Sequence, residues 1–337
     1  MSSSISGSKN AAWTYTKVLL GICAFVIIGL EISSYYLLDH DSLTYSRISR
    51  QYERALTLRR AAPGQPPSVL IVGNSLLLHG IQLDRLRSLT SGSMRIYPIF
   101  LEATGYYDWL FGLRKIFHEG ARPDVVVVGV GVNYFLSNNI RPDYTPMEFV
   151  ASRDVPALAS ALRLDNTEKS DLWFSHFSVF WDTRTAIRTQ ILKHIIPHLQ
   201  ELFDLLSPRA AIPQGPEFDA IALPRLQRLR ELCEEHGAKL ILLVPPTLGS
   251  ESAVKEMADA ARTAGVDVSV PVDPEALSAK FFEPDGMHLN REGAVVFTAA
   301  LAKDLPARLA VENTLAYGSP ARTEQPVSIV DPKKPSE

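Results

Sequence analysis

The sequence predicts an α/β protein, a three-layer α/β/α sandwich around a five-stranded parallel sheet, with an N-terminal transmembrane helix and a helical insertion. Five short runs of apolar, mostly branched residues alternate with helical patterns, as in sheets whose strands are buried on both faces. One long apolar segment lies near the N-terminus. Of the 337 residues, 46% are hydrophobic and 21% are charged, which excludes a wholly disordered, collagen-like or coiled-coil protein.

The apolar segment 18–38, interrupted only by Glu31, is long enough to cross a bilayer, which takes about 20 helical residues. Lys9 and Lys17 precede it and acidic residues follow it. Because positive charges remain in the cytoplasm, we expect residues 1–17 to form a cytoplasmic tail. The segment is then an uncleaved signal-anchor in the inner membrane, and the rest of the chain is periplasmic. A cleaved signal peptide and a buried helix of a soluble protein remain as alternatives.

The order of elements predicts the domain boundaries. Residues 39–67 are expected to be a polar stalk or linker helix that ends in a proline-rich turn. The α/β domain spans residues 68–312, and a proline-containing, weakly apolar tail at 313–337 is expected to be disordered. Strands are expected at 68–72, 95–100, 124–130, 239–244 and 266–270. Helices are expected at about 79–90, 105–119, 221–237, 251–264 and 291–309.

Residues 137–220 are too long for a simple crossover between the third and fourth strands. We interpret them as an inserted helical cap. Its aromatic residues are expected to form the core of the cap, with a ligand-stacking surface as the alternative; they are Trp173, Phe174, Phe177, Phe180 and Trp181.

Charge and cysteine content exclude two further classes of protein. Lys and Arg number 34 and Asp and Glu number 37, so the net charge is −3. Such a chain lacks the broad positive field that non-specific nucleic-acid binding requires. Cys23 and Cys233 form neither a disulfide framework nor a metal-binding cluster, and both are expected to be unpaired core thiols.

Gly73, Asn74 and Ser75 directly follow the first predicted strand. Ser75 is therefore expected at the carboxyl edge of the sheet, and Gly73 permits a tight turn there. The helix that follows places the Ser75 amide where negative charge is favoured. Taken alone, the motif is better explained by an ordinary helix N-cap serine.

Asp285 and His288 lie three residues apart in a turn-forming stretch before the last helix. A histidine that holds a carboxylate on one ring nitrogen can act through the other as base for a serine hydroxyl. Glu283 is a weaker candidate for the acid. Because parallel strands place their carboxyl ends at one edge, we expect Ser75 and His288 to meet there. Three histidines of the insertion are expected to be surface or core residues, namely His176, His194 and His198.

Acyl transfer also needs donors for an oxyanion. Gly105 follows the second strand, where its backbone N–H has room to approach a ligand, and Asn133 follows the third strand with a side-chain amide. The alternative explanations are a helix-start glycine and a turn asparagine.

Taken together, these segments resemble the SGNH or GDSL-type serine hydrolases. The family has G-D-S or G-N-S after the first strand, a glycine after the second, G-x-N after the third, and D-x-x-H before the last helix. The matching segments, in order along residues 68–306, are Gly73-Asn74-Ser75, Gly105, Gly131-Val132-Asn133 and Asp285-Gly286-Met287-His288. Tyr134 stands where the family usually has Asp, and the insertion is not part of the minimal fold.

The resemblance implies a flavodoxin-like sheet and a role for each residue. Ser75 is the nucleophile, His288 the general base and acid, and Asp285 the residue that orients His288. The backbone N–H groups of Ser75 and Gly105, with the Asn133 side chain, form the oxyanion hole. No metal or cofactor is implied.

With a membrane anchor and an outward-facing domain, the chain resembles bacterial SGNH proteins that add or remove acetyl groups on cell-surface polysaccharides. Some of these work beside a multi-spanning membrane protein that donates the acyl group. We therefore expect a serine esterase or O-acyltransferase that forms an acyl-enzyme on an acylated carbohydrate or other ester, with hydrolase and transferase both open. The alternative is a catalytically silent SGNH-fold scaffold subunit of an envelope polysaccharide assembly.

Overall fold

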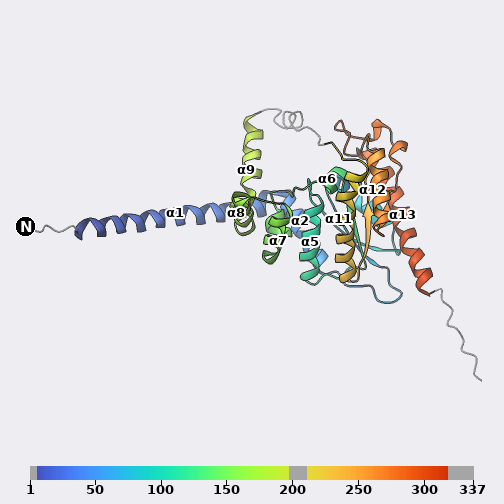
Figure 1. The fold of residues 1–337 in the computed structure, drawn as a ribbon, viewed down its shortest axis with the longest axis horizontal. Coiled ribbons are helices and arrows are strands. Elements are labelled where there is room, and N and C mark those ends of the chain that lie inside the picture. The colour runs from blue at the N-terminus through green and yellow to red at the C-terminus, as the bar shows by residue number, and fades with distance from the viewer. Residues whose placement is uncertain (1–5, 197–210, 318–337) are drawn as a thin grey trace, which may run out of the picture.

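The computed structural model describes residues 6–196 and 211–317, and its first element is a long helix that projects from the globular part (Figure 1). This helix is α1 (Ser6–Asp41). Among the described residues it contains the one stretch, Trp13–His40, that is long and apolar enough to cross a membrane. Its apolar side chains are largely exposed, so the structure does not support a buried core helix there. Cys23 is consequently exposed rather than buried as predicted, whereas Cys233 is buried.

The five predicted strands form one parallel sheet in the order β2-β1-β3-β4-β5. From β1 the chain moves to one side to form β2 and then returns to the other side to form β3. The carboxyl ends of β1 and β3 therefore border the crevice where ligands bind in open α/β sheets. The strands are β1 (Ser68–Gly73), β2 (Arg95–Phe100), β3 (Val125–Gly129), β4 (Lys239–Leu243) and β5 (Asp267–Ser269).

Helices cover both faces of the sheet, which confirms the three-layer α/β/α class. Along β1, Leu70 and Val72 enter one apolar core and Val69 and Ile71 enter the other, and all four are fully buried. The first core is covered by α5 (Tyr106–His118), α11 (Pro216–Glu235) and α12 (Glu251–Thr263). The second core is covered by α3 (Ser75–Gly80), α4 (Leu83–Leu89) and α13 (Arg291–Tyr317). This period-2 burial explains why the strands read as continuous apolar runs.

Three helical boundaries differ from the prediction. The helix expected at 221–237 is α11, which already begins at Pro216. The helix expected at 79–90 is divided into α3 and α4, because Ile81 and Gln82 adopt extended backbone conformations. The last helix continues to Tyr317, so residues 313–317 are helical instead of beginning a disordered tail. The rest of that tail lies outside the described residues.

The expected stalk is a helix that packs on the domain. Only Ser42 separates α1 from α2 (Leu43–Leu56), whose Ile48 and Ala55 are completely buried. Gln51 Oε1 accepts a hydrogen bond from the Phe100 N–H at 3.0 Å, which joins α2 to the end of β2. The apolar face of α2 requires burial, so this segment belongs to the α/β domain.

In the insertion, residues 145–195 lie beside α5 and α1 (Figure 1), whereas residues 211–214 line a cleft with Asn133 at the carboxyl edge of the sheet. The insertion contains η1 (Thr145–Phe149), η2 (Ser152–Asp154), α7 (Val155–Ala161), α8 (Asn166–Phe177) and α9 (Val179–Ile195).

The aromatic residues of α8 do not form a core for the insertion. Trp173, Phe174 and Phe177 are 37%, 57% and 67% exposed, respectively. His176 hydrogen bonds to the Pro146 carbonyl and to Ser152, as a structural histidine does. The His194 side chain and His198 lie outside the described residues.

Asp182 of α9 provides a test of pH-dependent stability. It is buried, its Oδ2 accepts the Tyr144 N–H at 2.8 Å, and its Oδ1 has no partner among the described residues. Burial raises the pKa of Asp182 to about 8, although the Tyr144 N–H opposes the shift. In an unfolded chain the pKa of Asp is about 4. The folded state therefore binds this proton more tightly, and the resulting stabilisation is lost as the pH rises through about 8.

Asp182→Asn keeps a neutral side chain of the same shape. We expect the Tm of the parent protein to fall between about pH 6 and about pH 9, and that of the variant to fall less. Asp84→Asn, at a fully exposed carboxylate on α4, should follow the parent. Parallel Tm curves for the parent and Asp182→Asn would contradict the assignment.

Candidate active site

Ser75 is the first residue of α3, immediately after β1, and it is not the helix cap. Asn74 occupies the N-cap position, where its Oδ1 accepts the Leu76 N–H at 3.1 Å. The N-cap explanation of Ser75 is therefore wrong, and its hydroxyl is available for another partner. Gly73 has no positive φ; instead, a Cβ there would lie 2.2 Å from the Gly129 carbonyl oxygen. Glycine is thus required for close approach of β1 and β3 rather than for the predicted turn.

The loop that carries His288 folds back on itself. The Glu283 N–H donates to the His288 carbonyl at 2.8 Å, and Gly286 makes the turn with a φ of +66°. Asp285 Oδ1 accepts the backbone N–H groups of Met287 and His288 at 2.7 and 3.0 Å. These local bonds hold the Asp285 carboxylate beside the imidazole, as an Asx-type turn does.

A continuous chain of hydrogen bonds joins the two ends of the domain. Ser75 Oγ lies 2.8 Å from His288 Nε2, and His288 Nδ1 lies 2.6 Å from Asp285 Oδ2. Partial burial raises the pKa of Asp285, but the bonds from the His288 side chain and from the two N–H groups lower it further, so the net shift is downward. The ionised carboxylate can only accept, which assigns the ring proton to Nδ1 and leaves Nε2 to accept the Ser75 hydroxyl proton.

Glu283, the weaker candidate for the acid, does not take this position. Its side chain is exposed, and its contact with His288 is made by the backbone N–H. Sequence analysis missed His79, one helical turn after Ser75, whose ring centre lies 5.0 Å from that of His288 in an edge-on arrangement. The i,i+4 spacing from Ser75 was the available signal.

The three predicted oxyanion donors have different environments. The Ser75 N–H starts α3 and has no hydrogen-bond partner among the described residues. The Asn133 side chain is exposed on α6 (Val132–Leu136), at the crevice next to Met287. The Gly105 N–H, in contrast, donates to Asp108 Oδ2 at 2.8 Å within the capping box of α5. The unengaged donors are therefore those of Ser75 and Asn133.

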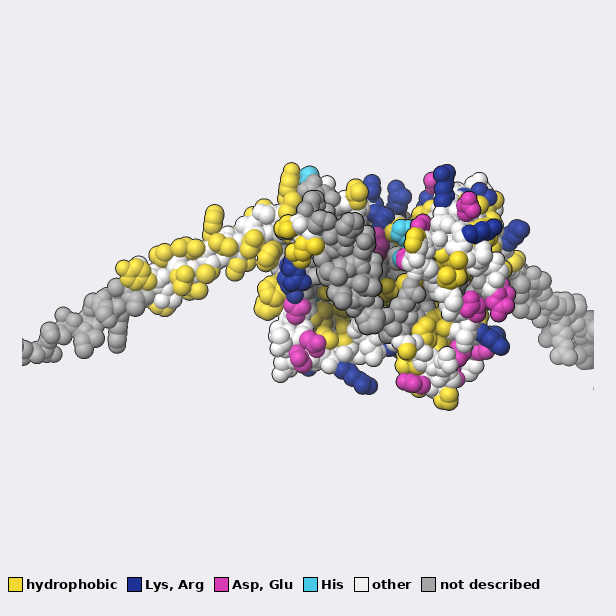
Figure 2. Space-filling model, turned by 90° about the horizontal axis from the view of Figure 1, so that it is seen from above, with side chains coloured by type: hydrophobic (Ala, Val, Ile, Leu, Met, Phe, Trp, Pro, Cys, Tyr) yellow, Lys and Arg dark blue, Asp and Glu magenta, His cyan; other side chains and the backbone are white. Residues whose placement is uncertain are grey.

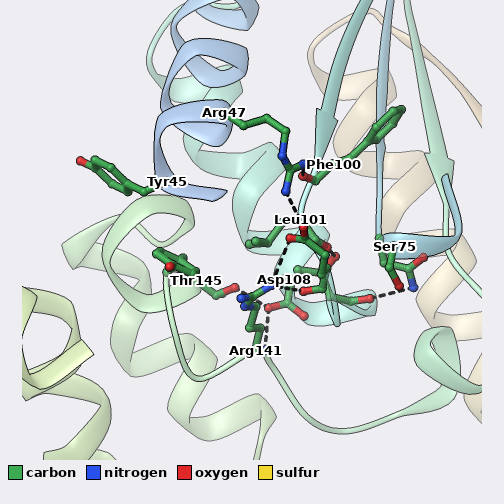
Figure 3. Close-up of polar contacts among 12 residues, drawn as sticks. Tyr45, Arg47, Ser75, Phe100, Leu101, Asp108, Arg141 and Thr145 are labelled. Carbon is green, nitrogen blue, oxygen red and sulfur yellow. Dashed lines mark hydrogen bonds and ion pairs between the residues drawn. The ribbon is translucent and has the colours of Figure 1, made fainter. Parts of the chain in front are cut away.

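Asp108 was not identified from the sequence, and it organises the loop that contains Gly105 (Figure 3). It is buried, and its Oδ1 accepts the Thr145 hydroxyl at 2.6 Å and the Arg141 N–H at 2.9 Å. Burial raises the pKa of Asp108 to about 6, against the lowering effect of these donors and the Gly105 N–H. The carboxylate is thus a structural acceptor that holds the loop after β2 against the insertion.

Arginine side chains extend this network towards α2. Arg141 Nη1 donates to the Glu102 carbonyl at 2.5 Å, and Arg47 Nη2 of α2 bonds Glu102 Oε1 at 2.6 Å. Arg47 also bonds the Phe100 carbonyl at the end of β2 (Figure 3). Polar contacts therefore connect α2, the helix that follows α1, to the carboxyl end of β2 at the edge of the sheet where Ser75 lies.

A third arginine supports the loop after β3. Arg225 of α11 is buried and donates to the Phe135 carbonyl at 2.6 Å and to the Ser137 carbonyl at 2.8 Å. Its guanidinium lies 4.8 Å from the ring centre of Tyr106. These contacts fix the helical turn that presents Asn133.

A cleft of about 440 Å³ adjoins the site at Asn133 and Met287. Residues 247–250, in the loop after β4, form one wall, and residues 211–214, at the end of the insertion, form another. The walls combine hydroxyl, amide and carboxylate groups with apolar side chains such as Ile212, Leu248 and Met287, which suits an amphipathic ligand. Within the described residues, no group of three or more His, Cys, Asp or Glu side chains is arranged to hold a metal ion.

No protein-family model matches this sequence, and no curated protein matches it. Solved structures that match include an α/β hydrolase enzyme from the metagenome of Lake Arreo, Spain, at 11% identity and a TM-score of 0.40, over 71% of this chain and 95% of that one. A GDSL-like lipase from Bacteroides thetaiotaomicron matches at 11% identity and a TM-score of 0.40, over 78% and 98% of the two chains. An acetylxylan esterase from Geobacillus stearothermophilus matches at 12% identity and a TM-score of 0.37, over 71% and 94%. At these identities and TM-scores the likenesses assign no role to any residue of this chain.

Proposed function

We propose that this chain is a serine esterase or O-acyltransferase of the SGNH type. The observation that carries the proposal is the hydrogen-bonded series Ser75–His288–Asp285 at the carboxyl edge of the sheet. Two residues 213 positions apart meet there with the geometry of a nucleophile and its base.

In the proposed reaction His288 Nε2 takes the hydroxyl proton as Ser75 Oγ attacks the ester carbonyl carbon. The negative charge on the carbonyl oxygen is met by the Ser75 N–H and the Asn133 side chain. When the tetrahedral intermediate collapses, the ester C–O bond breaks and His288 returns its proton to the departing alcohol. Water or an acceptor hydroxyl then attacks the acyl-serine by the same steps, and this gives the acid or a new ester. Asp285 keeps the imidazole oriented and stabilises its charged form.

The location and substrate proposals rest on α1 and on the cleft. The exposed apolar segment 18–38 of α1, with Lys9 and Lys17 before it, supports a single-pass inner-membrane anchor with the catalytic domain in the periplasm. The mixed polar and apolar walls of the cleft support an acylated carbohydrate as substrate, whose hydroxyl groups and acyl group need both kinds of contact. We propose acetyl groups of a cell-surface polysaccharide as the group transferred, with a multi-spanning acyl-donor protein as a partner.

A serine-directed fluorophosphonate probe tests the enzymatic proposal. We expect the full-length protein to be labelled at Ser75 and the Ser75→Ala variant to remain unlabelled. Absence of labelling in the folded parent would instead favour the silent scaffold. Incubation with an acetyl donor ester and candidate oligosaccharides, followed by mass spectrometry, shows whether acetate is transferred to water or to sugar.

Gly105→Ala tests whether the loops after β2 and β3 must lie in close contact. A Cβ at position 105 would lie 2.5 Å from the Tyr134 carbonyl oxygen, which is backbone and cannot rotate away. The two loops must separate, so we expect kcat/KM for an acetyl ester to fall by about 10²-fold, a typical effect of a displacement of about 1 Å at a catalytic site.

Gly80→Ala is the matched control, because its Cβ would lie 3.5 Å from Phe297 Cδ1, in ordinary contact. That variant should keep the parent activity. Full activity in Gly105→Ala would show that this close approach is not needed to assemble the site.

A further inference from the structure

The junction of α8 and α9 is fixed to α1 by Glu31, the carboxylate that interrupts the apolar segment. Glu31 Oε1 accepts the Val179 N–H at 2.6 Å, and Oε2 accepts the Ser178 hydroxyl at 2.8 Å and the Phe180 N–H at 3.2 Å. An acceptor at the start of α9 satisfies N–H groups that have no partner within the helix. The position of Glu31 along α1 therefore sets the position of the whole α8–α9 pair.

Glu31 is the first described residue of α1 whose side chain is partly buried, although Ile32, Tyr35, Tyr36 and Leu37 after it remain 45% to 65% exposed. From Trp13 to Leu30, which are 62% and 40% exposed, the described structure packs nothing against the apolar side chains. This stretch is about 27 Å long at the rise of an α-helix, close to the roughly 30 Å of a hydrocarbon core. Burial against the protein begins with Ser34 and Leu38. If residues 13–30 of α1, in place of the 18–38 expected from the sequence, cross the hydrocarbon core, Glu31 and the α8–α9 junction lie at its surface.

At the level of Glu31 along α1, α8 exposes apolar side chains on its surface. Trp173, Phe174 and Phe177 lie on one side of the helix by their spacing, and we call them the aromatic face. The Trp173 and Phe177 rings stack at 5.5 Å, while the neighbouring His176 is hydrogen bonded to the protein. A helix at the surface of a soluble domain normally exposes polar residues and buries apolar ones.

Hydrophobic side chains continue from α1 onto the adjoining end of the globular part (Figure 2). In Figure 1, α9 runs across the direction of α1, as an element lying along a bilayer surface does. The Trp181 ring, packed on Phe174 at 5.3 Å, bonds Asp171 through its Nε1 and lies under the Arg184 guanidinium. Such a mixture of aromatic, acidic and basic groups is typical of the headgroup region.

We propose that the α8–α9 pair docks on the surface of the bilayer that α1 spans, with the aromatic face inserted among the lipid headgroups. The occupant is lipid, because Glu31 joins the helix pair that carries the aromatic face to α1 directly after its exposed apolar stretch 13–30. The proposal rests on the membrane anchoring by α1 and not on the esterase chemistry. Docking at two places, α1 and the aromatic face, restricts rotation of the domain and holds the cleft at a set height above the membrane.

The test uses the full-length chain in phosphatidylcholine–phosphatidylglycerol liposomes, in a Cys23→Ser background. The buried Cys233 does not react in the folded protein. Phe177→Cys carries an environment-sensitive fluorophore in one sample. Leu89→Cys, at a 52% exposed side chain on α4, which packs against α13, carries it in the control. We expect the label at position 177 to be blue-shifted, quenched by lipids brominated near the headgroup and protected from aqueous iodide, and the label at position 89 to show none of these effects.

Three outcomes overturn the proposal. In the first, the label at position 177 is as accessible to iodide as the label at position 89, in liposomes that retain the protein. In the second, the label at position 177 is protected only when other membrane proteins are present. In the third, the protein does not float with the liposomes. The last outcome also removes the anchor. Circular dichroism and thermal unfolding of the same samples show whether the variants are folded, and fluorophosphonate labelling of Ser75 tests the esterase proposal separately.

Discussion

Replacing Ser75 with alanine is expected to lower kcat for an acetyl ester by about 10⁴- to 10⁶-fold and to leave the unfolding transition nearly unchanged. The variant loses the oxygen that attacks the carbonyl, and no neighbouring hydroxyl is bonded to His288 among the described residues. The loss in stability is small because Ser75 is only partly buried and makes one side-chain hydrogen bond, worth about 1 kcal/mol. Alanine is also a better helix former at the start of α3.

The measurement pairs steady-state ester hydrolysis with thermal unfolding of the same preparation. Ser88→Ala, at an exposed serine of α4, is the matched control and should change neither quantity. Parent-level turnover in Ser75→Ala would remove the nucleophile assignment and, with it, the proposed mechanism.

Replacing Asp285 with asparagine is expected to lower kcat by about 10⁴-fold, as a carboxylate-to-amide change behind a catalytic histidine does. The amide oxygen can still accept the Met287 and His288 N–H groups, so the loop keeps its shape. The other position, 2.6 Å from His288 Nδ1, then holds an NH₂ donor. The imidazole must place its proton on Nε2, where it faces Ser75 Oγ and can no longer accept the hydroxyl proton.

Glu283→Gln separates this role from a general effect of negative charge. Glu283 is exposed and meets His288 only through its backbone, so this variant should keep nearly full activity. Equal losses in the two variants would contradict the assignment of Asp285. Because hydrogen bonds hold the pKa of Asp285 below its usual value, the carboxylate is ionised at neutral pH. The rate difference between the parent and Asp285→Asn should therefore persist throughout the neutral range.

The helix that follows α1 and the helices of the insertion show where local patterns were misleading. The many polar residues of 39–67 indicate a stalk. The segment also carries a narrow apolar stripe that contains Ile48 and Ala55, and the sequence alone does not distinguish such a stripe from scattered apolar residues. The folded structure reveals the stripe, because it is buried against the edge of the sheet. The aromatic residues of α8 suggested a core, because aromatic rings in a soluble helix are usually buried. Their exposure depends on how α8 is turned, which follows from its contacts with η1 and α9, and α9 in turn packs against α1, which lies far away in the sequence.

Strand positions and the pairing of Asp285 with His288 could be predicted from the sequence, because both depend on near neighbours in the chain. A strand that is buried on both faces needs a continuous run of apolar, mostly branched residues. In a D-x-x-H turn, the Asp carboxylate and the His imidazole are close in the chain, so the turn itself brings them together. The meeting of Ser75 with His288 was expected only through sheet topology, and the three-dimensional packing supplies its 2.8 Å geometry.

Only the tertiary structure shows how the Gly105 N–H is used. Its partner Asp108 is three residues away, but that carboxylate faces Gly105 because Thr145 and the Arg141 backbone hold its second oxygen. A backbone N–H looks the same in every sequence, and its availability to a substrate depends on which acceptor the folded chain brings to it.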